Sequence, residues 1–283
     1  MRASQSHNPR PPGEPPRGER LRGAASRAGA IASLLRRVRD GLMASAYPEQ
    51  CRVCGGAVES YDDGVACEDC WLDSTITKMI GGAACHKCGA PLYDRAGRRQ
   101  LCGTCAEFPF SAARCCGVYS GALEASILFL KSHPHVCRRL REMISRTFSD
   151  HLPALASDVV IPVPLHRLRE RGRGFNQAKI IAKVIARDFQ IRLDDRALVR
   201  ARATERHRVG LDAVDRKKSV ERAFSVTRPT LVGGLSVLLV DDLFTTGSTI
   251  SAASNALLEA GARRVNVLTV ARVEDRARAA LKK

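Results

Sequence analysis

The hydrophobic pattern divides this chain of 283 residues into three regions. Residues 1–27 consist mainly of Pro, Gly, Arg and Ser with almost nothing to bury, which predicts disorder. Residues 28–47 have apolar side chains at helical spacing, and residues 51–105 are turn-rich and poor in periodic segments. We therefore predict a basic disordered tail with a short amphipathic helix over residues 1–46, a cysteine-rich module over 47–111, and an α/β domain over 112–283.

Within the third region, apolar runs alternate with helical periods. Strands are predicted at residues 114–119, 159–163, 236–240 and 265–270, and helices at residues 123–131, 136–149, 175–189 and 249–260. An apolar strand followed by a helix recurs, and this order requires right-handed crossovers between parallel neighbours. The predicted fold is a mostly parallel sheet with helices on both faces. A polar and basic connection is expected over residues 199–220.

The charge balance favours anionic partners. The chain has 46 Lys and Arg against 29 Asp and Glu, for a formal net charge of +17. The excess is concentrated in the tail (nine Arg against three acidic residues in 1–45) and in residues 165–222 (seventeen basic against eight acidic). Charge alone leaves open whether the anion is a phosphate-bearing small molecule, nucleic acid or an acidic surface.

Eight of the eleven cysteines form four C-x-x-C pairs. Two such pairs supply the four tetrahedral sulfur ligands that structural Zn²⁺ prefers, so eight cysteines make two complete sets. A redox dithiol is the alternative, but that motif occurs once per βαβ unit and not four times in series. The pairs could combine sequentially or interleaved, and the spacing leaves this open. The predicted zinc ligands are Cys51, Cys54, Cys67, Cys70, Cys85, Cys88, Cys102 and Cys105.

Three further cysteines, Cys115, Cys116 and Cys137, are predicted to be small core residues. Residues 28–35 form an apolar stretch too short for a signal peptide, and no run approaches the roughly 18 apolar residues of a membrane span. We therefore predict a cytoplasmic protein without a membrane span, whose thiols hold metal.

The stretch VLLVDDLFTTGSTI, residues 237–250, combines two chemical signals. Asp241 and Asp242 come at the end of the predicted strand, where ligands of parallel sheets gather, and can accept hydrogen bonds from sugar hydroxyls or share a divalent cation. The hydroxyls and glycine of residues 245–249 then open a helix, which favours an anion such as phosphate. An ordinary strand end with a Ser/Thr helix cap is the alternative, and no Walker lysine is present. The stretch resembles the phosphoribosyl-pyrophosphate (PRPP) motif of type I phosphoribosyltransferases.

A second stretch, IPVPLHRLRERGRGFNQ, spans residues 161–177. It indicates a strand end stiffened by two prolines, a loop with four arginines and a glycine-led helix start. Clustered guanidinium groups suit pyrophosphate, although a solvated basic loop is the alternative. Behind the paired zinc motifs and ahead of VDD and TTGST, this stretch resembles the ComF family of phosphoribosyltransferase-like proteins with a double zinc ribbon. The likeness extends from Cys51 to about Val273.

The resemblance implies roles for particular residues. Asp241 and Asp242 would contact the ribose hydroxyls and Mg²⁺, and the loop of residues 245–249 would hold the 5′-phosphate. Lys131 of FLK would face the pyrophosphate. The catalytic candidates are Asp241, Asp242, Lys131 and Arg173. The PRPP-binding candidates besides the aspartates are Thr245, Thr246, Gly247, Ser248, Thr249, Gly174, Asn176 and Gln177. The chain departs from the family in residues 202–224, where glutamine is usual near His207 and asparagine near Ser219, so a substrate contact from this segment is not carried over.

For function, the resemblance implies transfer of a phosphoribosyl group from PRPP to an unidentified acceptor with release of pyrophosphate, linked to DNA uptake. No residue indicates the nucleophile or a general base, so PRPP binding is better supported than turnover, and whether the protein is an enzyme stays open. The alternative is a non-enzymatic, zinc-containing accessory protein of DNA uptake that binds single-stranded DNA. Aromatic residues are only 5% of the chain, which leaves few stacking platforms for bases.

Overall fold

The computed structural model describes residues 49–58, 64–72, 84–90, 102, 105–200 and 223–273. The chain divides into two compact units, Met1–Pro48 and Glu49–Lys283, and all described residues belong to the second. The predicted tail and first helix, and most of the basic connection with His207 and Ser219, lie outside the described residues. The boundaries predicted at residues 46 and 111 therefore remain predictions.

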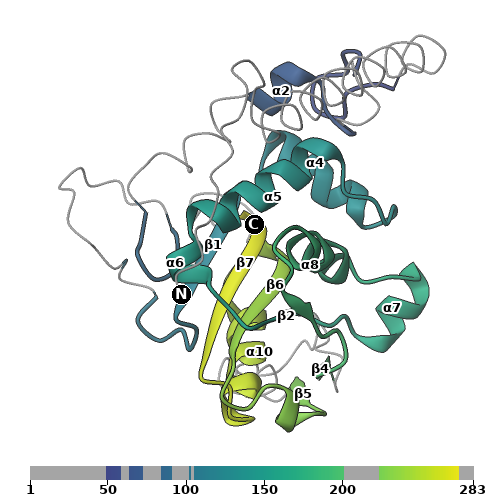
Figure 1. Cartoon of the computed structure of the whole chain (residues 1–283). Helices are drawn as coiled ribbons and strands as arrows, with labels where there is room; N and C mark the ends of the chain where they lie inside the picture. Colours follow the sequence, from purple (N-terminus) through teal and green to yellow (C-terminus); the bar gives the residue numbers. More distant parts are fainter. Residues whose placement is uncertain are drawn as a thin grey trace, which may run out of the picture. The chain divides into compact units, whose positions relative to one another are not determined.

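The elements follow one another in an alternating order (Figure 1). They are α2 (Glu68–Leu72), β1 (Ala112–Val118), α4 (Gly121–Leu130), α5 (Arg138–Asp150), α6 (Leu152–Leu155), β2 (Val159–Pro162), α7 (Arg167–Arg173), α8 (Gln177–Asp188), β3 (Arg192–Leu193), β4 (Leu198–Arg200), β5 (Phe224–Val226), the 3₁₀ helix η2 (Pro229–Leu231), β6 (Ser236–Phe244), α10 (Ser248–Glu259) and β7 (Arg264–Arg272). The predicted parallel sheet is confirmed: five strands pair in the order β1-β7-β6-β2-β3, all parallel.

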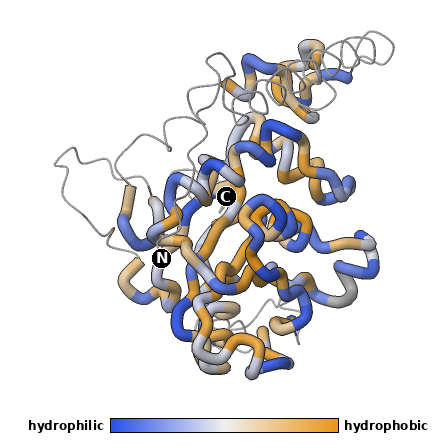
Figure 2. Tube along the Cα trace, viewed as in Figure 1, coloured by the Kyte–Doolittle hydropathy of each residue, from blue (hydrophilic) through white to orange (hydrophobic). Residues whose placement is uncertain are grey.

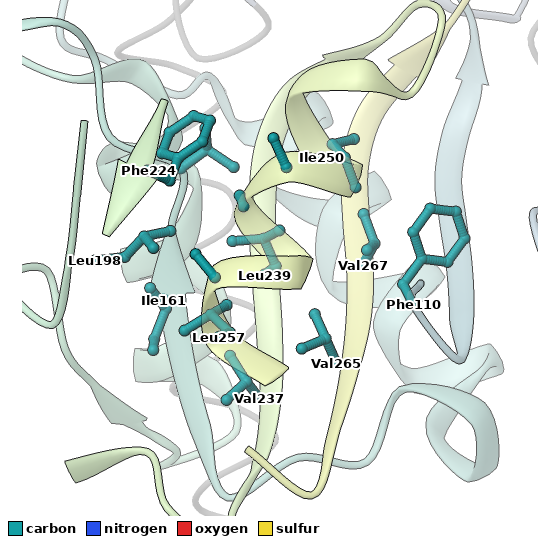
Figure 3. Close-up of a cluster of buried hydrophobic side chains, with 14 of the residues drawn as sticks. Phe110, Ile161, Leu198, Phe224, Val237, Leu239, Ile250, Leu257, Val265 and Val267 are labelled. Atoms are coloured by element: carbon teal, nitrogen blue, oxygen red, sulfur yellow. The ribbon is translucent and has the colours of Figure 1, made fainter. Parts of the chain in front are cut away.

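The central strand β6 explains why its sequence is apolar without alternation. Successive side chains of a strand point to opposite faces, and helices cover both faces of this sheet. Leu238 and Val240 join one buried layer with side chains of α4, α5 and α8. Val237 and Leu239 join the other layer, which contains α10 and Phe110 (Figure 3). The apolar residues accordingly concentrate along the central strands of the trace (Figure 2).

Three parts of the fold differ from the sequence-based expectation. The predicted strand 236–240 continues to Phe244, because β7 goes on pairing with it as far as Phe244 and Arg272. The predicted arginine loop contains the helix α7, which ends at Arg173. Leu198–Arg200 forms an antiparallel pair with β5, a contact between segments that local patterning does not link. Among the described residues no helix is long and apolar enough to cross a membrane.

Candidate functional site

The eight predicted zinc ligands form two clusters, and each cluster uses consecutive pairs. The first cluster comprises Cys51, Cys54, Cys67 and Cys70, and the second comprises Cys85, Cys88, Cys102 and Cys105. The sequential combination left open by the spacing is therefore the observed one. In each cluster the sulfur atoms all lie within 4.8 Å of one another. A Zn–S distance of about 2.3 Å places tetrahedral sulfur ligands about 3.8 Å apart, so both clusters fit zinc.

Backbone amides direct their hydrogens at the sulfur atoms. The N–H groups of Val53 and Gly56 donate to Cys51 and Cys54 at 3.4 Å each, and that of Cys102 donates to Cys85 at 3.3 Å. Burial raises the pKa of Cys51, but hydrogen bonds from the backbone amides of Cys54, Cys67 and Val53 outweigh burial and lower the pKa to about 6. The fold thus favours thiolate at the first ligand, which is the form that binds metal.

The two carboxylates lie where β6 loses one of its neighbours. The last bond between β2 and β6 runs from Val163 N to the Val240 carbonyl at 2.8 Å. The Val163 carbonyl instead accepts a bond of 2.9 Å from Asn176 Nδ2. The amide of Asp242 donates to Asp241 Oδ1 at 2.9 Å rather than to β2. Among the described strands, β7 alone therefore pairs with this part of β6, and Asp241 and Asp242 lie where the sheet opens on the β2 side.

Both carboxylates are half-buried, and the loss of solvent around them makes them hard to ionise. It raises the pKa of Asp241 well above its usual range, and the negative charge of Asp242 raises it further. Burial also raises the pKa of Asp242, while the positive charges of Lys131 and Arg173 oppose that rise. The charges of Lys131, directly after α4, and of Arg173, the last residue of α7, thus act on Asp242 of β6. A cation or hydroxyl donors at this place would relieve the cost of two half-buried neighbouring charges.

The loop of residues 245–249 links β6 to α10. Gly247 precedes the helix with a φ of 81°, a left-handed conformation that glycine adopts without strain, and it provides no side-chain cap. The hydroxyls of Thr246 and Ser248 lie 2.8 Å apart, and the Ser248 amide donates to Thr246 Oγ1 at 3.3 Å. Thr245, Thr246 and Ser248 are exposed. The helix start therefore offers hydroxyls and a free N-terminal end to an anion.

The three remaining signature residues have structural roles that the sequence did not reveal. Gly174 ends α7 with a φ of 77° and donates to the Glu170 carbonyl at 2.7 Å. Asn176 caps α8 by accepting a bond of 3.0 Å from the Ala178 amide, in addition to its bond to the Val163 carbonyl directly after β2. Gln177 is only 2% exposed. These contacts fix the entry to α8, and direct binding of a ligand by the three residues stays a prediction.

Two residues near the carboxylates were not predicted. Arg200 on β4 lowers the pKa of Asp241 through its positive charge, and the negative charge of Asp242 contributes to raising the pKa of Tyr119, behind burial and Glu124. Arg200 also lines a cavity of about 120 Å³, together with Pro162, Asn176 and the ion pair of Lys179 with Asp195. No sequence signal marks Arg200, because only the pairing of β4 with β5 places it here.

Comparisons with known proteins agree with this architecture. A family model described as double zinc ribbon domain matches residues 42–106, and one described as phosphoribosyl transferase domain matches residues 130–283. The DNA utilization protein YhgH of Escherichia coli O6:H1 is 32% identical over 199 residues, which are 66% of this chain and 83% of that protein.

Two relatives carry competence names. Competence protein ComFC of Bacillus subtilis is 27% identical over 209 residues, 68% of this chain and 78% of that protein. Competence protein F of Haemophilus influenzae is 34% identical over 116 residues, 41% of this chain and 50% of that protein. Two zinc-binding ribbons ahead of a phosphoribosyltransferase domain define the class of protein. The chain belongs to the ComF family of phosphoribosyltransferase-like proteins.

Proposed function

We propose that the chain binds PRPP with Mg²⁺ at the end of β6 and transfers its phosphoribosyl group to an acceptor. The observation that carries the proposal is the position of Asp241 and Asp242 near the end of β6, where β2 no longer pairs with it, directly before the loop of residues 245–249. The positive charges of Lys131 and Arg173 act on Asp242 there. The carboxylates suit the ribose hydroxyls, the loop suits the 5′-phosphate, and the two cations suit the pyrophosphate. A substrate of this kind and thiol-bound zinc support a cytoplasmic location, which we include in the proposal.

In the proposed reaction, the bond between ribose C1 and a pyrophosphate oxygen breaks, and pyrophosphate leaves with the electron pair. A lone pair of the acceptor forms the new bond to C1, through an oxocarbenium-like state. Lys131 and Arg173 stabilise the charge that grows on the leaving group, and the loop holds the other end of the sugar in place. Asp241 and Asp242 are the residues that would hold Mg²⁺, which supplies further neutralisation of pyrophosphate.

The cavity beside Arg200 is the place we propose for the acceptor. It lies between the end of β2, the start of α8 and β4, and it shares Arg200 with the surroundings of Asp241. Its wall offers both a cation and a carboxylate, from Lys179 and Asp195. A small polar molecule with hydrogen-bond donors and acceptors matches this wall, as a nitrogen nucleophile would.

Calorimetry tests the binding step. PRPP is titrated into the zinc-loaded full chain with and without Mg²⁺, using wild type, the double variant Asp241→Asn/Asp242→Asn, and Asp150→Asn as a control. Asp150 lies at the end of α5 in an exposed pair with Arg146. We expect binding by wild type and the control only. Absence of heat with wild-type protein in both conditions would sink the proposal. Pyrophosphate release in a screen of amines and bases then tests turnover.

The alternative function, binding of single-stranded DNA without catalysis, has its own support. The relatives' names refer to DNA utilization and competence, and the chain is strongly basic. Beside the first cluster, Arg52 lies 5.1 Å from the ring centroid of Phe129, and Phe129 stacks on His133 at 4.1 Å. Such a stack suits a nucleic-acid base. Affinity for an oligonucleotide that falls steeply with salt, drops in Phe129→Ala and is unchanged in the double aspartate variant would favour this function.

A further inference from the structure

Arg272, the last residue of β7, is a buried cation in contact with the second cluster. It is only 8% exposed, and its Nη1 donates to the Cys88 carbonyl at 2.5 Å. Its Nη2 lies 3.8 Å from the Cys88 sulfur. Burying a guanidinium is costly unless an anion compensates it. Four thiolates on one Zn²⁺ carry a net charge of −2, so a zinc-loaded second cluster would supply that anion.

The other side of Arg272 contacts an aromatic group. Its Cζ lies 4.3 Å from the ring centroid of Phe244, the last residue of β6. The ring of Phe244 lies 5.9 Å from that of Phe108 and 6.1 Å from that of Phe110, and the latter two lie 5.1 Å apart. Phe108 follows the second cluster directly, since its amide donates to the Cys105 carbonyl at 3.2 Å. The three rings therefore connect the second cluster to the end of β6.

The same rings support the loop of residues 245–249. A Cβ added to Gly247 would lie 3.0 Å from the Cζ atoms of both Phe108 and Phe244. This is closer than side chains normally pack, so the loop backbone rests directly on the two rings. A shift of either ring would change the conformation of Gly247, which also accepts a bond of 2.7 Å from Ser251 in the first turn of α10.

We propose that Arg272 is a positioning residue that couples the second cluster to this loop, so that the loop holds its anion-binding conformation only while that cluster is loaded with zinc. Loss of the ion would leave the guanidinium without its anion and release the rings beneath Gly247. The anion-binding part of this inference rests on the function proposed above. The coupling itself does not, because it concerns contacts within the chain.

Hydrogen–deuterium exchange of the zinc-loaded full chain tests the coupling without any ligand. The variants are Arg272→Met, which keeps an unbranched apolar chain close to the aliphatic part of arginine but removes the charged group, and Arg264→Met as a control at the other end of β7. Arg264 bonds to Ser236 and the Ala156 carbonyl, away from cluster and loop. We expect amide exchange in residues 247–251 to rise about tenfold in Arg272→Met only. Wild-type exchange of these amides in a folded Arg272→Met protein would overturn the coupling.

Zinc release gives a second, independent reading. With a chromogenic chelator and mapping of the freed cysteines by alkylation, Arg272→Met should release zinc from the second cluster about tenfold faster, with the first cluster unchanged. Equal release from both clusters would contradict the proposal. Arg272→Lys should rescue only in part, because an ammonium cannot both stack on Phe244 and bond to Cys88. If Arg272→Met does not fold, Phe108→Leu is used instead, because it removes the Phe108 ring beside Gly247. The same exchange measurement on residues 247–251 then tests the coupling.

A PRPP titration separates this inference from the proposed function. If wild type binds PRPP and Arg272→Met binds it at least about tenfold more weakly, both are supported. If wild type shows no binding, the proposed function fails, while the exchange data still decide the coupling. If Arg272→Met binds PRPP as wild type does, the loop does not depend on the second cluster and the inference is wrong.

Discussion

The two zinc clusters have the same kind of ligands at similar spacing but lie against different parts of the phosphoribosyltransferase domain. Cys51, Cys67 and the neighbouring Trp71 join the buried layer of α4, α5 and α8. The second cluster joins the layer of α10, and the Lys87 carbonyl accepts a bond of 2.7 Å from Ala113 of β1. In the part of the chain that the structure describes, only the second cluster reaches the loop of residues 245–249, through Arg272 and Phe108. One metal motif can thus contact only the core in one place and support a surface loop in another.

Removing one cysteine ligand, from either the first or the second cluster, should give the largest difference between the two clusters. Cys54→Ser and Cys88→Ser should each bind one zinc per chain instead of two, since a structural zinc contributes about 10–16 kcal/mol to folding of its module. Only Cys88→Ser should lose the slow amide exchange of residues 247–251. Metal analysis and hydrogen exchange measure the two results. Equal loss of loop protection in both variants would show that the clusters are not functionally distinct.

Two glycines, one near each cluster, allow the same comparison with a smaller expected loss of stability. Near the first cluster, a Cβ added to Gly64 would lie 2.6 Å from the Cβ of Cys137. Near the second cluster, a Cβ added to Gly89 would lie 2.7 Å from the Ala113 carbonyl oxygen. Both have positive φ angles. Gly64→Ala and Gly89→Ala should each lower the free energy of unfolding by about 1–3 kcal/mol. PRPP affinity, measured by calorimetry, should fall in Gly89→Ala alone, and an equal fall in Gly64→Ala would speak against the comparison.

The two regions should also respond to pH with opposite sign. Burial raises the pKa of Asp241, so ionisation costs stability, and the stability of the ligand-free protein falls as pH rises through the raised pKa. Between α5 and α8, a hydrogen bond from Arg141 lowers the pKa of Asp188. The stabilisation that this ionised carboxylate provides is therefore lost as pH falls through the lowered pKa.

Asparagine variants make this difference measurable by thermal unfolding at several pH values. At pH 7, Asp241→Asn should raise the melting temperature of the ligand-free protein by a few degrees, since 1 kcal/mol corresponds to roughly 2–4 °C in a domain of this size. Asp188→Asn should lower it by less, because pairs with an exposed partner contribute at most about 1 kcal/mol. A lower melting temperature for Asp241→Asn would contradict the cost that we assign to its burial.

The smallest effect is expected at the edge of the first ribbon. Arg52→Gln removes a cation beside the ring of Phe129, a contact of about 0.5–1 kcal/mol at an exposed position. Chemical denaturation should show a loss of this size, and loop exchange should remain as in wild type. A change in the amide exchange of residues 247–251 would mean that contacts of the first ribbon also affect the conformation of this loop.

Much of this architecture follows from local pattern in the sequence. The apolar runs at residues 159–163 and 265–270 predicted central strands, because a strand buried on both faces needs no polar alternation. The cysteine spacing predicted two zinc sites, but their composition depended on which hairpins lie together in space. The carboxylates and the hydroxyl loop are adjacent in sequence, so this half of the candidate site could be found without a structure.

The remaining residues of the site depend on contacts between distant segments. Arg200 reaches Asp241 only because β4 pairs with β5, and Arg272 meets Cys88 across 184 positions of sequence. Phe108 was unremarkable in the sequence, since an aromatic residue after a zinc motif has many uses. The extension of β6 to Phe244 was missed because charged residues rarely continue a buried strand, and its pairing with β7 outweighs that tendency.

The two prolines at the end of β2 have a further consequence, for the solubility of the open edge. Val163 N points to β6, so the alternation of a strand turns the nitrogens of Pro162 and Pro164 toward the β3 side. Neither nitrogen carries a hydrogen, and β3 pairs with β2 only at Val159 and Val160. Without these two donors, the edge is a poor template for a strand from another molecule. The end of β2 can therefore stay unpaired on this side with little tendency to aggregate.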